Sequence, residues 1–165
     1  MTPMLEPLTV LFLSTGNAAR SIMAEALLRE KGGARLRARS AGYRPLSYVN
    51  PHTLALLAAE GISIEGLHSK GWNEFVAASH LLKIDAVVTL SEEARLHCPL
   101  WPGNPVRVHW TVDDPLAAEK PDVREWKFRK AFATLDARID TLIKTRLAPG
   151  GGELFLQLKG IGMVV

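Results

Sequence analysis

The stretch that decides the fold lies near the N-terminus and runs through two segments, Leu8-Thr9-Val10-Leu11-Phe12-Leu13 and then Ser14-Thr15-Gly16-Asn17-Ala18-Ala19-Arg20-Ser21. The first segment is a nearly unbroken apolar run, which is typical of a strand buried on both faces. After the second segment, apolar residues recur with helical spacing up to a stop at Gly32-Gly33. The stretch therefore predicts a buried strand, a short polar loop and a helix.

Strand and helix patterns alternate along the rest of the chain. Further strands are expected at residues 36–41, 84–90 and 106–110, and helices at residues 51–61, 91–95 and 121–147. This alternation predicts a single α/β domain with a four-stranded parallel sheet and helices on both faces. We expect an N-terminal extension at residues 1–7, the domain at residues 8–147 and an apolar tail at residues 148–165, which adds an edge strand or contacts a partner.

Composition excludes several classes of protein. The 165 residues are 47% hydrophobic and 22% charged, the balance of one globular domain. No apolar run reaches the roughly 18 residues of a membrane span, and no signal peptide is visible, so we expect a cytoplasmic protein without a membrane partner. The net charge of +3 comes from scattered residues, and the alternating Arg35, Arg37 and Arg39 favour an exposed strand face over a nucleic-acid site.

Residues of the polar loop suit the binding of a tetrahedral oxyanion such as phosphate, arsenate or sulfate. Gly16 lets the backbone turn inward, Ala18 and Ala19 leave their amides accessible, and Asn17 can hold the turn with its side chain. The helix N-terminus that follows offers free N–H groups and partial positive charge. Arg20 adds a planar fork that binds oxyanions bidentately. The alternative is an ordinary strand-to-helix turn capped by Ser21.

Beyond these physical arguments, residues 10–27 resemble the low-molecular-weight protein tyrosine phosphatase family, in particular its thioredoxin-coupled arsenate reductases. The resemblance continues in order over residues 8–147. It rests on the motifs Ser40-Ala41-Gly42, Val49-Asn50-Pro51, Gly61-Ile62-Ser63-Ile64, His68-Ser69-Lys70, Val87-Val88-Thr89-Leu90, His97-Cys98-Pro99, Pro102-Gly103, His109-Trp110, Asp113-Asp114-Pro115 and Phe128-Arg129.

The resemblance implies a reactive cysteine where this chain has a serine. Family members carry a nucleophilic thiolate at the first loop position, stabilised by the loop amides, the helix dipole and the arginine. The catalytic positions so implied are Ser14, Arg20, Ser21 and Asp114, and the oxyanion-binding positions are Thr15, Gly16, Asn17, Ala18, Ala19 and Arg20. Asp114 is the implied general acid, with Asp113 as the fallback, and a plain Asp-Asp-Pro turn is the alternative.

This chain also lacks part of the redox relay that the reductases have. They pass the oxidising equivalent through two more cysteines, which thioredoxin reduces; the matching positions here are Ser91 and Cys98. Seven helical residues would separate these positions by about 10 Å, beyond the reach of a disulfide, so a reductase must unwind this segment. With one cysteine, no internal disulfide can form in this chain, although Cys98 could still meet thioredoxin. A lone cysteine is more often a small packing residue.

These departures predict an arsenate reductase-like protein that binds oxyanion and does not turn over as it stands. Either it derives from a true reductase whose two cysteines were replaced, or it is a natural non-catalytic protein that binds an oxyanion or phosphorylated ligand. A serine-based phosphatase would need a base, and the loop offers none.

The resemblance also implies a change at the position where some family members hold a cation. Asn17, Glu25 and Ser40 match residues that hold potassium in some reductases, and the fourth matching position is Lys70. A lysine ammonium there would occupy the cation position and pair with Glu25, so we expect no potassium requirement. The alternative for Glu25 is a solvated helix residue. No cofactor is expected, and no zinc site either, because His68, His97 and His109 lack ligand spacing.

Overall fold

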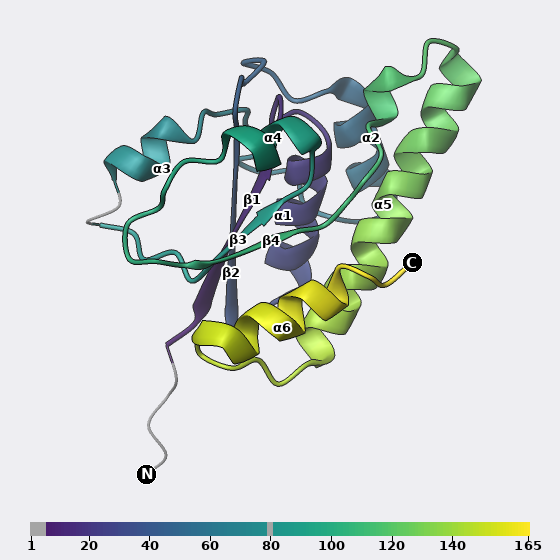
Figure 1. Ribbon diagram of the computed structural model, residues 1–165. Coiled ribbons are helices and arrows are strands. Elements are labelled where there is room, and N and C mark those ends of the chain that lie inside the picture. Colours follow the sequence, from purple (N-terminus) through teal and green to yellow (C-terminus); the bar gives the residue numbers. More distant parts are fainter. Residues whose placement is uncertain (1–5, 79–80) are drawn as a thin grey trace.

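The computed structural model describes residues 6–78 and 81–165. Its strands are β1 (Leu8–Ser14), β2 (Leu36–Gly42), β3 (Ala86–Thr89) and β4 (Val106–His109). Its α-helices are α1 (Arg20–Lys31), α2 (Pro51–Ala59), α3 (Asn73–Ala77), α4 (Glu92–His97), α5 (Pro121–Lys144) and α6 (Gly151–Ile161), and a short 3-10 helix, η1, spans Pro115–Ala117. Figure 1 shows the sheet edge-on between its helices.

The four strands form one parallel sheet in the order β2-β1-β3-β4, as the alternation of patterns predicted. β1 is central and pairs with β2 from Leu8↔Leu36 to Ser14↔Gly42, and with β3 from Val10↔Ala86 to Leu13↔Thr89. Because the chain leaves β1 for β2 on one side and reaches β3 on the other, the strand order reverses beside β1. A crevice at the carboxyl ends of the strands is expected at such a point.

Helices cover both faces of the sheet, which confirms the predicted fold class (Figure 1). One face packs against α1, α2 and α5 in a large core that includes Phe12, Leu27 and Leu135. The opposite face carries a smaller core in which Leu11 and Val87 meet Ala94 of α4 and two tryptophans, Trp72 and Trp101. Successive side chains of β1 point into the two cores in turn, which explains why its sequence is apolar at nearly every position.

The apolar tail forms a helix, so the predicted edge strand is wrong. Leu154, Leu158 and Ile161 lie at helical spacing on α6 and are buried in the large core. Trp110, just after β4, donates from Nε1 to the backbone oxygen of Leu158 at 2.9 Å. A glycine at 162 is required here, since a Cβ would lie 2.4 Å from the Trp110 ring. The tail thus covers the β4 side of the sheet.

Other expectations differ from the structure only at their ends. α5 ends at Lys144 instead of residue 147, and α1 begins at Arg20, so Ser21 is not its cap. Arg37 is exposed on β2 and Arg39 is half-buried, which fits the expected solvent-facing side of that strand. Within residues 6–78 and 81–165, no helix combines the length and the apolar character that crossing a membrane requires.

Candidate oxyanion-binding site

The loop between β1 and α1 turns its carbonyl groups outward. The backbone oxygens of Ser14, Thr15 and Gly16 accept from the amides of Tyr43, Arg44 and Leu46 at 2.8–3.1 Å. The Ala18 oxygen accepts from the Asn50 amide at 3.0 Å and from the Thr53 hydroxyl at 3.1 Å. Because the N–H of the next residue points away from each carbonyl in a trans peptide, the loop amides face the other way.

No described residue accepts a hydrogen bond from the amides of residues 15–19. A run of free N–H groups at the start of a 12-residue helix is an anion-binding arrangement, because the helix dipole adds partial positive charge at the same place. The alternative of an ordinary capped turn is wrong, since α1 has no side-chain cap and Ser21 lies inside its first turn.

Asn17 holds the loop in shape from beneath. Its backbone has φ of 48°, a left-handed conformation that asparagine tolerates better than most residues, and its side chain is fully buried. The amide nitrogen Nδ2 donates to Ser21 Oγ at 2.7 Å and to Ser40 Oγ at 3.0 Å, while Oδ1 accepts from the Lys70 amide at 3.0 Å. One side chain thus connects the loop to α1, β2 and residue 70.

Ser14 ends β1 at the floor of the loop, where only 2% of it is exposed. Its hydroxyl lies 2.5 Å from Ser21 Oγ, and either oxygen can be the donor. Among the described residues, no carboxylate, imidazole or amine hydrogen-bonds the Ser14 hydroxyl. The hydroxyl therefore has a polar partner that orients it but no base that could remove its proton.

Arg20 and Asp114 lie together at the mouth of the loop. Arg20 donates from Nη1 to the backbone oxygen of Val112 at 3.0 Å, and its Nη2 lies 3.7 Å from Asp114 Oδ2. Burial lowers the pKa of Arg20, and the charge of Asp114 opposes that shift. Asp114 caps η1 by accepting from the Leu116 amide at 3.0 Å. Asp113 is exposed and does not line the cavity described below.

The four residues matched to the family's cation position lie in direct contact behind the loop. Lys70 Nζ is 3.6 Å from Glu25 Oε1 and donates to Ser40 Oγ at 3.3 Å and to the His68 oxygen at 3.0 Å. Ser40 in turn donates to Glu25 at 2.7 Å. Burial lowers the pKa of Lys70, while Glu25 raises it. Glu25 is thus a buried partner of an ammonium group rather than a solvated helix residue.

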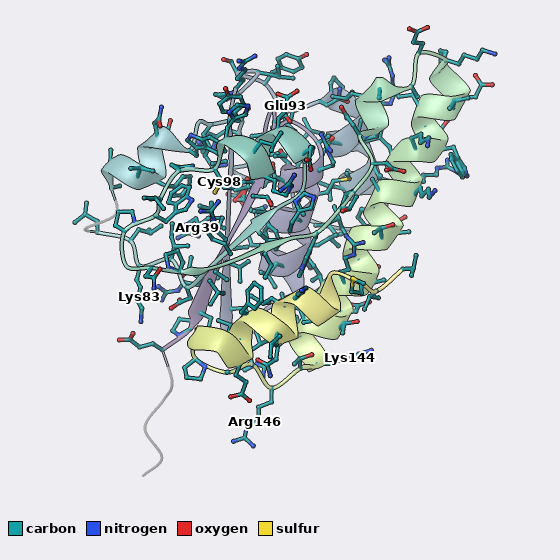
Figure 2. The ribbon with its side chains drawn as sticks, in the orientation of Figure 1. Arg39, Lys83, Glu93, Cys98, Lys144 and Arg146 are labelled. Atoms are coloured by element: carbon teal, nitrogen blue, oxygen red, sulfur yellow. The ribbon has the colours of Figure 1, made fainter. Side chains whose placement is uncertain are left out.

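The two positions of the family's redox relay lie at opposite ends of α4. Ser91 is its N-cap, accepting from the Ala94 amide at 3.2 Å and from the Thr15 hydroxyl at 2.9 Å. Cys98 follows the helix and packs against the smaller core, with Trp101 Nε1 donating to its sulfur at 3.4 Å. Figure 2 shows Cys98 below Glu93 on the side of the sheet that α4 covers.

A cavity of about 290 Å³ opens over the loop at the carboxyl end of the sheet. Besides the predicted residues it is lined by four that sequence reasoning missed, namely Arg44, Leu46, Glu93 and Leu116. Arg44 and Leu46 follow β2, Glu93 lies at the start of α4 after β3, and Leu116 lies in η1 after β4. The rule that ligands bind at the carboxyl ends of strands could therefore have found them. In Figure 2, Glu93 lies at this end of the molecule and Lys83 near the other.

The chain belongs to a known family that shares this loop and fold. A family model described as low molecular weight phosphotyrosine protein phosphatase matches residues 9–149. Within it, the chain is 36% identical over 137 residues to an arsenate reductase of Halalkalibacterium halodurans, covering 82% of this chain and 95% of that protein. The resemblance drawn from the sequence motifs is therefore confirmed.

Solved structures agree with this assignment. A structure described as an arsenate reductase in the phosphate binding state has a TM-score of 0.68 and 26% identity, covering 83% of this chain and 97% of that one. A thioredoxin-dependent arsenate reductase of Corynebacterium glutamicum has a TM-score of 0.65 and 28% identity; the match covers 86% of this chain and 63% of that longer one.

Proposed function

We propose that this protein binds a tetrahedral oxyanion, whether arsenate, phosphate or sulfate, in the loop of residues 14–20 and does not turn it over as it stands. The observation that carries the proposal is the run of free amides at residues 15–19 beside the Arg20 guanidinium. A similar fold has been solved in a phosphate-bound form. Both support a binding role for the loop.

The lack of turnover follows from the group at position 14. The loop stabilises an anionic nucleophile, and a thiol ionises readily in such surroundings. A serine hydroxyl is far less acidic and needs a neighbouring base, which Ser14 lacks among the described residues. Arg20 would still hold the oxyanion, and Asp114 would have no bond cleavage to assist.

Electron transfer to thioredoxin is interrupted in the same way. A reductase of this type needs two cysteines to form a disulfide after arsenate is reduced, and this chain has only Cys98. The thiolate of Cys98 could still attack the disulfide of oxidised thioredoxin, which forms a mixed disulfide and releases one thioredoxin thiolate, but the chain has no second thiol with which to form the disulfide that thioredoxin reduces.

The test compares the protein with the double variant Ser14→Cys, Ser91→Cys. Binding of arsenate, phosphate and sulfate is measured by calorimetry, and turnover is measured with arsenate plus thioredoxin, thioredoxin reductase and NADPH, and with p-nitrophenyl phosphate. We expect the original chain to bind oxyanion without turnover. Arsenate reduction or ester hydrolysis by the original chain would overturn the proposal.

The double variant separates a reductase scaffold from a non-catalytic binding protein. If it reduces arsenate, the scaffold is a reductase that lacks only its thiols. If it binds oxyanion without turnover, the protein is a non-catalytic binder of oxyanions or phosphorylated ligands, and its serines belong to that role.

A further inference from the structure

The cavity over the loop is larger than one oxyanion requires. It measures about 290 Å³, whereas each molecule of liquid water occupies about 30 Å³. The free amides lie only at its floor, and the walls come from segments that follow β2, β3 and β4. The walls therefore have room to contact a group attached to the oxyanion.

Arg44 supplies a second cation in this wall, apart from Arg20. Arg20 is already engaged by the Val112 oxygen and by Asp114. For Arg44, no carboxylate in residues 6–78 and 81–165 lies within ion-pair distance. Its fork can therefore bind an anionic group bidentately without first giving up an ion pair with a carboxylate of the described residues.

Contacts within the protein hold Arg44 in place before any ligand binds. Its amide donates to the Thr15 oxygen at 2.8 Å, which ties its backbone to the loop. Its guanidinium carbon lies 4.9 Å from the centre of the Tyr43 ring, and Nη2 donates to the Tyr43 hydroxyl at 3.4 Å. Tyr43 is itself stacked on His97, with ring centres 4.4 Å apart and planes within 6°. Such preorganisation reduces the entropy lost on binding.

The remaining wall residues differ from Arg44 in charge. Glu93 and Asp114 make their part of the cavity acidic, and Leu46 and Leu116 add apolar surface. An anion held by the loop therefore meets repulsion near Glu93 and attraction near Arg44. A ligand with a second negative charge is directed toward Arg44, and its carbon skeleton can contact the two leucines.

We propose that Arg44 determines specificity by binding a carboxylate on a phosphorylated ligand, so that the site prefers a small phosphate monoester with a second acidic group. This inference rests on the proposed function, because it needs the loop to hold the phosphate. The absence of turnover keeps such an ester intact in the site.

The experiment measures dissociation constants by calorimetry for inorganic phosphate and for two matched pairs of esters. The pairs are carboxymethyl phosphate with ethyl phosphate, and 4-carboxyphenyl phosphate with phenyl phosphate, so that a short and a long spacing to Arg44 are both sampled. We expect the carboxylate to improve affinity about 3- to 10-fold in at least one pair, the range of a partly exposed charge-assisted contact.

Variants then locate the effect. Arg44→Gln should abolish the preference for the carboxylate, and Arg44→Lys should retain part of it, because the charge stays while the planar fork is lost. Arg107→Gln, which removes an exposed arginine of β4 outside the cavity, should change none of the five constants.

Two results would contradict the inference. If phosphate binds but neither pair shows a preference for the carboxylate, the role of Arg44 is overturned while the proposed function stands. The same holds if the preference persists in Arg44→Gln. Failure of all five compounds to bind overturns the proposed function as well.

Discussion

The loop of residues 14–20 and the segment of residues 91–98 each carry a serine where the resembled reductases carry a cysteine, but the two serines lie in different surroundings. Ser14 is 2% exposed and contacts Ser21 at the floor of a buried hydrogen-bonded network. Ser91 is 4% exposed and caps a short helix whose other residues are mostly exposed. The same exchange of sulfur for oxygen therefore has different consequences.

In the loop the exchange alters the nucleophile, while the loop amides, Asn17 and Arg20 that form the proposed binding geometry are all present. In residues 91–98 it favours the folded helix, since serine is among the best N-cap residues. The resemblance implies that a reductase unwinds this segment to join its two cysteines. The comparison thus separates the proposed oxyanion-binding loop from the segment that matches the reductases' relay, in which Ser91 caps a folded helix.

The largest expected effect tests how rigidly the loop is supported from behind. Lys70→Met would leave the Glu25 carboxylate without its cation, and the two side chains are only 8% and 11% exposed. Removing one member of such a pair costs roughly 3–5 kcal/mol, so the urea midpoint should fall sharply. The double variant Lys70→Met, Glu25→Gln should recover most of the loss, and a single-variant cost below about 1 kcal/mol would contradict this view.

The same cluster predicts how the protein responds to potassium. Because the Lys70 ammonium already contacts Glu25 and Ser40, potassium chloride should raise the melting temperature no more than sodium chloride does at equal ionic strength. A rise specific to potassium would show that a cation binds despite the lysine.

The next effect tests the proposed oxyanion binding directly. Arg20→Ala removes a charge-assisted contact to the oxyanion, which is worth about 1.5–3 kcal/mol, so phosphate affinity should fall roughly 10- to 100-fold by calorimetry. Arg95→Gln is the matched control on α4, where the exposed arginine pairs only with Glu92. Equal losses in both variants would mean that general charge, not the loop, attracts the anion.

A smaller effect tests whether the Ser91 cap keeps residues 92–97 folded as a helix. Ser91→Ala removes the bonds from the Ala94 amide and the Thr15 hydroxyl and should cost about 1 kcal/mol. Hydrogen exchange should accelerate at residues 92–97 and stay unchanged in α1. Ser91→Asp keeps an acceptor at the cap and should restore slow exchange; unchanged exchange in Ser91→Ala would remove the contrast between the two regions.

The smallest effect concerns the pH dependence of stability on the α4 side. Burial lowers the pKa of His109 below its ordinary 6.5; Glu92 opposes the shift, and Arg95 and Arg138 add to it. The unfolded chain therefore binds this proton first as pH falls below 6.5, and stability decreases down to the folded pKa. Denaturation midpoints at pH 7.5 and 5.5 should differ less in His109→Gln; an unchanged difference would assign the pH dependence to other groups.

Much of the fold could be predicted because its signals are local. The unbroken apolar run of β1 and the octet after it specify a buried strand and an anion-binding turn within 14 residues. The sequence pattern of the tail did not predict its helix, because apolar residues occur on more than one face of α6. The spacing of Leu154, Leu158 and Ile161 is nevertheless that of a helix face. Exposed Leu156 and Met163 obscured that period.

The rim of the site could not be predicted in the same way. Arg44 and Glu93 lie 49 positions apart and match no local pattern, and they meet only because the carboxyl ends of parallel strands converge. The pairing of Lys70 with Glu25 was expected only through the family resemblance. Its contacts with Ser40 and its position behind Asn17 needed the packed structure.

By itself the sequence determined the fold class, the loop between β1 and α1 and the absence of a thiol at position 14, because these depend on residue type and short-range spacing. The tertiary structure decided which groups line the cavity. It turned the loop carbonyls outward onto residues 43–53, placed Ser91 as the N-cap of α4, and brought to the rim a second arginine, Arg44, that pairs with no carboxylate of the described residues. Those features depend on the packing of distant segments, which local chemistry does not specify.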